Sequence, residues 1–162
     1  MSEQLLTGYN IRCGTIVDRA LLVKFMQLTY QDLFPLQDFS HLAQTVEQYF
    51  SISTPLWWVE KQLEKSRPVS SSPVGCIWVG NSIDQVRGDR HAHIFLLYVL
   101  PEHRRQGIGK ALMQYAEDWA RNRGDRQIGL QVFTSNTAAL NLYNQLGYQT
   151  QSLSMFKSLR GD

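Results

Sequence analysis

Apolar residues recur along the chain with two different spacings, and these spacings divide it into helices and strands. A recurrence every three or four residues predicts helices at 18–32, 40–50, 107–123 and 136–146. Alternating or continuous apolar runs, rich in β-branched and aromatic residues, predict strands at 9–14, 56–63, 74–79, 91–100, 128–133 and 153–157. Helices followed by a hairpin, and then strand–helix–strand–helix–strand, are typical of an α/β protein. We therefore expect one mixed sheet with helices on both faces.

The boundary between the strand at 91–100 and the helix at 107–123 is the most distinctive point of the chain. The strand, HAHIFLLYVL, is almost wholly apolar, as in a strand that is covered on both faces. It leads into PEHRRQGIGKAL, which places basic residues and two glycines just where the helix begins. One apolar stripe follows along the helix, and Gly124 is well placed as its C′ residue.

The composition is that of one soluble domain. The 162 residues carry a net charge of +2, and no apolar run approaches the roughly 20 residues that span a bilayer. The N-terminus lacks the basic and apolar regions of a signal peptide, and Cys13 and Cys76 form no CxxC motif. Neither polar loop, KSRPVSSSP at 65–73 or NSIDQVRGD at 81–89, divides the chain. We expect a single cytoplasmic domain over 1–162 without a nucleic-acid or membrane partner, and leave a homodimer open.

The start of the helix at 107 favours the binding of an anion. A helix N-terminus leaves backbone N–H groups unpaired and carries about half a positive charge. Glycines let a ligand approach the backbone, and Arg104, Arg105 and Lys110 add positive charge, so a phosphate or diphosphate fits best. The alternative is a glycine-containing turn with solvated arginines.

Two familiar phosphate motifs do not fit this stretch. A P-loop needs glycine at 104 and Ser or Thr at 111, where this chain has Arg104 and Ala111. A Rossmann fingerprint needs a third glycine at 112, which is Leu112.

The stretch at 104–109 instead reads R-x-x-G-x-G after an apolar strand. Further on, LQVFTSNTAALNLYNQLGY at 130–148 gives a strand, an asparagine that opens a helix, a tyrosine and then Leu-Gly-aromatic. Together the two segments resemble the GNAT superfamily of N-acetyltransferases. The resemblance implies the GNAT fold, an α/β fold with a mixed, mostly antiparallel sheet and a splayed central parallel pair, here 91–100 and 127–133. It also implies acetyl-CoA as the cosubstrate.

The resemblance further implies where the cosubstrate binds. The pantetheine arm would pair with the strand backbone at 97–99, and the diphosphate would lie on the amides of 105–110. For 97–99 the alternative is plain sheet core. The full set of expected cofactor-binding residues is Leu97, Tyr98, Val99, Arg104, Arg105, Gln106, Gly107, Ile108, Gly109, Lys110, Asn136 and Tyr143.

Asn136 and Tyr143 are seven residues apart, so two helical turns bring them to one face. The resemblance makes Tyr143 the general acid that protonates the departing CoA thiolate. A phenol with a pKa near 10 keeps its proton at pH 7, and it donates to a thiolate of pKa ~8–9 only when held close to the sulfur. From the pattern alone, Asn136 reads equally as an N-cap and Tyr143 as a half-buried aromatic residue.

An acceptor amine also needs a base, because an ammonium of pKa near 10.4 is only about 0.04% neutral at pH 7. The family branch that acetylates ribosomal protein N-termini has a glutamate where this chain has Gln131. Other branches, histone acetyltransferases among them, have a base at the position of His93. Arylalkylamine acetyltransferases carry a His-x-His pair there, as this chain does at 91–93. We expect His93 as the base; the alternative is a structural His93, with Glu102 or a water as the base.

A metal site is not predicted, because no third ligand lies at a suitable spacing from the histidine pair. The resemblance places the acceptor pocket among the first two helices and the hairpin strands. That region is aromatic, with Asp32, Asp38, Glu47 and Glu60 interspersed, which suits a cationic amine. Most of these aromatic residues fit a core equally well. Neither the acceptor nor the preferred acyl chain is readable from the sequence.

We therefore predict direct transfer of an acetyl group from acetyl-CoA to a primary amine in a ternary complex. His93 would be the base, Tyr143 the acid, and a backbone N–H near Leu97 the oxyanion donor. The alternative is a non-catalytic acyl-CoA-binding sensor or subunit that shares the same loop. A nucleic-acid-binding helix at 104–123 is disfavoured by Glu117 and Asp118 in its middle.

Overall fold

A computed structural model describes residues 2–62 and 72–161 of the chain. Within it the chain forms two compact units, Met1–Gln131 and Val132–Asp162. The loop expected at 65–73 falls largely outside the described residues. The single domain expected over 1–162 stays a prediction.

The first unit contains a six-stranded sheet in the order β1-β2-β3-β4-β5-β6. Neighbouring strands from β1 to β5 are antiparallel, whereas β5 and β6 are parallel. This confirms the mixed, mostly antiparallel sheet with one parallel pair. The strands are β1 (Ser2–Leu6), β2 (Tyr9–Cys13), β3 (Leu56–Lys61), β4 (Pro73–Ile83), β5 (Arg90–Val99) and β6 (Ile128–Leu130).

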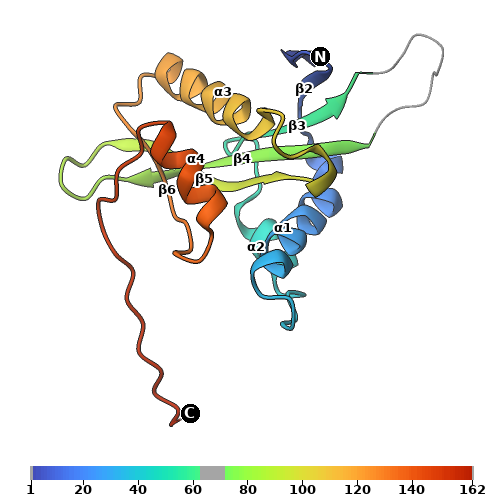
Figure 1. Ribbon diagram of the computed structural model, residues 1–162. Coiled ribbons are helices and arrows are strands. Elements are labelled where there is room, and N and C mark those ends of the chain that lie inside the picture. The colour runs from blue at the N-terminus through green and yellow to red at the C-terminus, as the bar shows by residue number, and fades with distance from the viewer. Residues whose placement is uncertain (1, 63–71, 162) are drawn as a thin grey trace. The chain divides into compact units, whose positions relative to one another are not determined.

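Three helices of this unit cover both faces of the sheet, as predicted. Figure 1 shows α3 (Ile108–Arg123) on one face and α1 (Arg19–Leu33) with α2 (Leu42–Tyr49) on the other. Short 3₁₀ turns, η1 (Ile16–Asp18) and η2 (Pro101–His103), precede α1 and α3. No helix among the described residues is both long and apolar enough to cross a membrane.

The core between the sheet and the first two helices is strongly aromatic. Trp58 and Trp78 are almost fully buried there, and the ring of Phe25 meets Trp58 edge-on at 5.2 Å. On the opposite face the ring of Trp57 lies 5.3 Å from that of Tyr115 in α3. Both faces of the central strands are therefore covered, which is why their sequence runs almost wholly apolar.

A β-bulge interrupts the pairing of β4 with β5. Trp78 faces Leu96 and Val79 faces Ile94, which leaves Phe95 as an extra residue of β5. Phe95 and Leu96 consequently both pack against the core beside α1 and α2. Gly80 provides the room, because a Cβ there would lie 2.0 Å from ring carbons of Phe95.

The second unit contains the helix α4 (Thr137–Gln145), followed by a segment without helix or strand up to residue 161. The strand predicted at 153–157 is therefore wrong for this structure. Its apolar residues are exposed: Leu153 by 76%, Met155 by 87% and Phe156 by 94%. Apolar alternation is a local signal, whereas a strand also needs a neighbour for its backbone hydrogen bonds.

Candidate active site

The chain turns sharply between β5 and α3, at the predicted diphosphate loop. Arg105 has a φ of 62° and Gly107, the N-cap of α3, a φ of 85°, so both adopt the left-handed conformation. The first hydrogen bond of the helix runs from Ala111 N–H to Gly107 C=O at 3.0 Å. The N–H groups of 108–110 precede it and have no acceptor within the helix. The loop therefore offers unpaired backbone donors at the positive end of a helix dipole.

Gly107 serves the loop through its conformation. A Cβ at this position would meet nothing within 4 Å, so space alone does not require glycine. The positive φ is what requires glycine, because only glycine adopts this conformation without a steric penalty. The same conformation at Arg105 is disfavoured and has to be held by the surroundings.

The side chain of Arg104 turns away from the loop. Its Nε donates to the Val99 carbonyl at 2.8 Å, and its Nη2 donates to Asp32 Oδ2 at 3.0 Å. The Tyr98 hydroxyl donates to the same carboxylate oxygen at 3.2 Å. Arg104 thus ties the end of β5 to the end of α1, and its charge is paired with a carboxylate. Arg104, Arg105 and Lys110 are all exposed, and Arg104 differs in its pairing with Asp32.

The backbone of β5 is paired on one side only beyond the bulge. On the β4 side, Leu97 pairs with Ile77 and Val99 with Gly75. On the β6 side, pairing is limited to three positions and ends where Ile94 meets Leu130. Within the part of the chain that the structure describes, no strand pairs with this side of β5 after Ile94. The pairing ends because β6 stops at Leu130, so it is shorter than the strand expected at 127–133. The expected pantetheine contacts at 97–99 lie on this free edge, and the splay of the two strands stays a prediction.

His93 lies half-buried on β5 and pairs in register with Gly129 of β6. A Cβ on Gly129 would approach His93 Nδ1 to 3.4 Å and His91 Cε1 to 3.3 Å, so the glycine makes room for both imidazoles. Burial and the neighbouring His91 lower the pKa of His93 below its ordinary value. A neutral imidazole at pH 7 is the form that accepts a proton.

His91 has a different environment. It is only 8% exposed, and its Nδ1 lies 2.9 Å from the Ala92 carbonyl. A carbonyl can only accept, so Nδ1 carries the hydrogen and is engaged within the strand. Of the two histidines, His93 is therefore the better candidate for a base.

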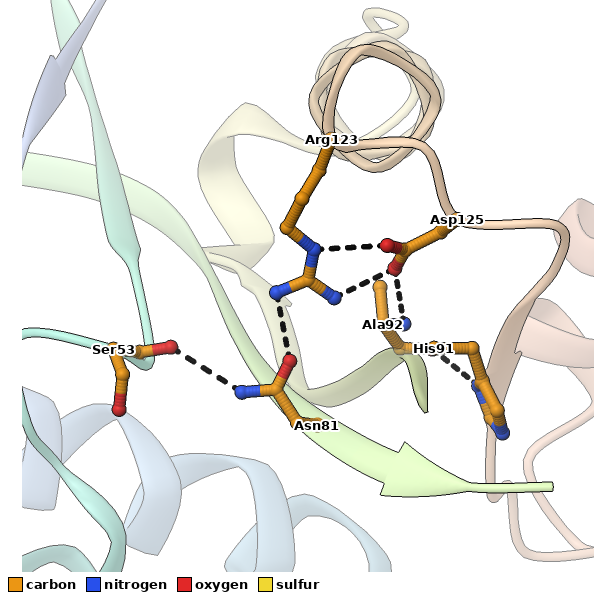
Figure 2. Close-up of polar contacts among 6 residues, drawn as sticks. All are labelled: Ser53, Asn81, His91, Ala92, Arg123 and Asp125. Atoms are coloured by element: carbon orange, nitrogen blue, oxygen red, sulfur yellow. Dashed lines mark hydrogen bonds and ion pairs between the residues drawn. The ribbon is translucent and has the colours of Figure 1, made fainter. Parts of the chain in front are cut away.

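A partly buried ion pair fixes the backbone between the two histidines (Figure 2). The Asp125 carboxylate accepts hydrogen bonds from the Arg123 guanidinium at 2.6 and 2.9 Å and from the Ala92 N–H at 2.7 Å. Arg123 also donates to Asn81 Oδ1 at 2.7 Å, and the Asn81 amide donates to the Ser53 carbonyl at 3.4 Å. The sequence reasoning missed this network, although Arg-Gly-Asp directly after a helix was a usable signal for a local ion pair.

The candidate acid lies on α4 in the second unit. Tyr143 is half-buried, and burial raises its pKa to about 12. Its ring lies 5.9 Å from that of Tyr148. Asn136 caps the helix by accepting a hydrogen bond from the Ala139 N–H at 3.2 Å. Asn136 thus stands at the N-cap and Tyr143 within the helix, and a shared face for the two side chains stays a prediction.

Three of the four carboxylates proposed for the acceptor pocket, Asp32, Asp38 and Glu60, have other partners. Asp32 binds Arg104 and Tyr98, Glu60 is paired with Arg12, and Asp38 accepts from the N–H and hydroxyl of Ser40 at 3.0 Å. Among the described residues, no group of three or more His, Cys, Asp or Glu side chains is placed to hold a metal ion.

Residues 23–148 match the Acetyltransferase (GNAT) family. The chain therefore belongs to the GNAT acetyltransferase family, whose members are acetyl-CoA-dependent acyltransferases, and the predicted family is confirmed. The match includes β5, the loop, α3 and α4, and so contains every candidate site residue described above.

Two curated relatives have sequences similar to parts of the chain. "N-acetyltransferase 8" of Homo sapiens is 32% identical over 94 residues, which cover 50% of this chain and 41% of the relative. "[Ribosomal protein bS18]-alanine N-acetyltransferase" of Escherichia coli K12 is 37% identical over 62 residues, which cover 38% of this chain and 42% of the relative. The chain thus spans less than half the length of these relatives.

Solved structures share the fold over nearly the whole chain. "Putative acetyl transferase from Pyrococcus furiosus" has a TM-score of 0.69 at 24% identity and covers 93% of this chain and 99% of its own. AAC(6')-Iy, solved in complex with a bisubstrate analogue of CoA, has a TM-score of 0.66 at 17% identity and covers 94% and 98%. At these identities the likeness shows the fold alone.

Proposed function

We propose that this chain transfers an acetyl group from acetyl-CoA directly to a primary amine within a ternary complex. The observation that carries the proposal is the continuous path formed by the free edge of β5 and the left-handed turn into α3. An extended pantetheine arm can pair with a free strand edge, and a diphosphate fits unpaired N–H groups at a helix N-terminus. The residues present therefore suit the cosubstrate.

In the proposed reaction the amine nitrogen attacks the thioester carbon. A C–N bond forms, the C–S bond breaks, and its electron pair stays on sulfur. The proton lost by the amine passes to His93, directly or through one water, and the CoA thiolate takes a proton from Tyr143. A backbone N–H near Leu97 would stabilise the negative charge on the carbonyl oxygen during attack.

The lowered pKa of His93 supports its role as base, because the imidazole is then neutral at pH 7. The raised pKa of Tyr143 has two consequences for its role as acid. The hydroxyl keeps its proton over the whole working range, but donation to a thiolate of pKa ~8–9 is less favourable than for an ordinary phenol. Close placement against the sulfur would have to compensate for that difference.

The proposal is tested by a panel of amines assayed for release of the CoA thiol, beside calorimetric titration of acetyl-CoA. The panel should include peptides with an N-terminal alanine and an aminoglycoside, since the names of similar proteins mention these acceptors. Acetylation of any amine supports the proposal. Binding of acetyl-CoA without acetylation of any acceptor would favour the sensor, and a protein that binds no acetyl-CoA would contradict both.

A further inference from the structure

Tyr9, on the second strand of the sheet, reaches the loop at the start of α3. Its side chain is buried, with 6% of the residue exposed. Its hydroxyl donates to Gln106 Oε1 at 2.8 Å and lies 2.9 Å from His103 Nδ1. The rings of Tyr9 and His103 also meet edge-on, with centroids 5.8 Å apart and planes at 87°. One buried phenol therefore holds both sides of the turn that contains Arg105.

The direction of these hydrogen bonds follows from the donors available. Tyr9 has one hydroxyl hydrogen, and it is donated to Gln106. His103 Nδ1 must then carry a hydrogen and donate to the phenol oxygen. The neutral Nδ1–H tautomer and the imidazolium both satisfy this arrangement. The hydrogen bonds therefore run from His103 through Tyr9 to Gln106.

The turn depends on such external support. Residues 104–107 are exposed, and Arg105 has a left-handed φ of 62°, which a non-glycine residue keeps only when its surroundings hold it. Arg104 holds the turn to the Val99 carbonyl, and Tyr9 holds it to β2. Neither residue needs to touch a ligand to do this.

We propose that Tyr9 is a positioning residue for the diphosphate of acetyl-CoA, acting through Gln106 and His103 on the amides of the loop. This inference rests on the proposed function, in which the amides of 105–110 bind that diphosphate. It assigns a role to an N-terminal residue that lies outside both sequence motifs.

The test is Tyr9→Phe, which keeps the ring in the core and removes only the hydroxyl. Tyr115→Phe is the matched control, because the Tyr115 hydroxyl donates to Glu3 Oε1 at 2.8 Å and also links the N-terminal strands to α3, away from the loop. We expect Tyr9→Phe to raise the Kd for acetyl-CoA about 3- to 30-fold and Tyr115→Phe to change it less than about twofold. In steady-state kinetics the KM for acetyl-CoA should rise while kcat changes little.

S-acetylpantetheine provides a second measurement, because it lacks the diphosphate. The kcat/KM for this donor should be the same in Tyr9→Phe and in the wild type. Equal losses with both donors, or equal losses in both tyrosine variants, would mean a general structural role and overturn the inference. If Tyr9→Phe does not fold, Gln106→Leu on the exposed turn makes the same test. If Tyr9→Phe binds acetyl-CoA as tightly as the wild type, the inference about Tyr9 is wrong and the proposed function is untouched. If Gly109→Val, which places a side chain in the loop itself, also binds acetyl-CoA as tightly as the wild type, the proposed diphosphate site is wrong.

Discussion

His93 shows how neighbours set the chemistry of a single side chain. Burial and His91 lower its pKa, while the missing side chain of Gly129 leaves space for its ring. The ring of Phe95, with its centroid 6.0 Å from that of the imidazole, adds an apolar neighbour. A base with a lowered pKa is neutral at pH 7, so its activity should persist well into mildly acidic solution.

His93→Ala should lower kcat/KM by roughly 10²- to 10⁴-fold, the usual range for a positioned base. In the wild type, kcat/KM should rise with pH through a pKa below 6.5 and then stay level, because the deprotonated form is active and the pKa is lowered. The variant should lose this acidic limb. The measurement is kcat/KM for the amine found by the panel, from about pH 5 to 9.

His91→Ala is the control for this prediction. Its Nδ1 is engaged with the Ala92 carbonyl, so its loss should affect turnover much less than the loss of His93. Similar, modest losses in the two variants, with the acidic limb retained, would assign His93 a structural role. The proton acceptor would then be Glu102 or a water.

At the scale of elements, Gly109 lies in the first turn of α3, directly after the left-handed turn that follows β5. Gly109→Val would place a branched side chain among the N–H groups expected to meet the diphosphate. We expect acetyl-CoA to bind at least tenfold more weakly, about 1.4 kcal/mol, with the fold intact. Calorimetry with acetyl-CoA measures the affinity, and a thermal melt checks the fold.

Gln114→Val is the matched control, since it adds the same residue at an exposed position of the same helix. It places the same β-branched side chain in the helix without obstructing the loop. Equal acetyl-CoA affinity in Gly109→Val and in this control would place the diphosphate elsewhere.

The start of β5 depends on the partly buried pair of Arg123 and Asp125. Arg123 and the Ala92 N–H lower the pKa of Asp125, whose side chain is 3% exposed. A carboxyl with a lowered folded pKa stabilises the protein above its unfolded pKa, near 3.9, and this stability is lost as pH falls through the folded value. Asp125→Asn should therefore lower the free energy of unfolding by about 2–4 kcal/mol at pH 7. The difference from the wild type should shrink as the pH falls below about 4. Denaturant unfolding at several pH values measures the difference.

Asp118→Asn makes the comparison with an exposed pair. Asp118 and Arg121 lie 2.7 Å apart, but their side chains are 71% and 69% exposed. Solvent screens such pairs, so this variant should change stability by less than about 1 kcal/mol. If Asp125→Asn lowers the free energy of unfolding no more than Asp118→Asn does, the Arg123–Asp125 pair does not stabilise the start of β5.

Helices and strands were predictable from the sequence where burial imposes a regular spacing of apolar residues. The contacts between these elements were not predictable. The helix at 107–123 and the strand at 91–100 appear as expected. The helix buries one continuous apolar stripe, and the strand is covered on both faces. β1 was missed, since Ser2–Leu6 begins with three exposed polar residues at the edge of the sheet. The pairing of Tyr9 with Gln106 joins residues 97 positions apart, and that of Asp32 with Arg104 joins residues 72 apart. No local pattern encodes either pair.

At the scale of the whole molecule, the candidate base and the candidate acid belong to different units of the chain. His93 lies in Met1–Gln131 and Tyr143 in Val132–Asp162. A sensor needs only the loop and the free edge of β5, both of which belong to the first unit. An enzyme that uses an acid also needs the hydroxyl of Tyr143. The variant that separates enzyme from sensor is therefore Tyr143→Phe.

As an acid, Tyr143 matters only when the C–S bond breaks, so Tyr143→Phe should lower kcat and leave the KM for acetyl-CoA nearly unchanged. We expect a fall of roughly 10- to 1000-fold, because a thiolate can also leave unaided. Since burial raises the pKa of Tyr143 to about 12, kcat of the wild type should show no alkaline loss from this group up to about pH 10. Tyr148→Phe, whose ring neighbours that of Tyr143, is the control and should keep wild-type turnover. Steady-state kinetics on an accepted amine, with thermal melts beside them, decide the matter: full turnover in Tyr143→Phe would exclude the acid role and leave solvent as the proton donor.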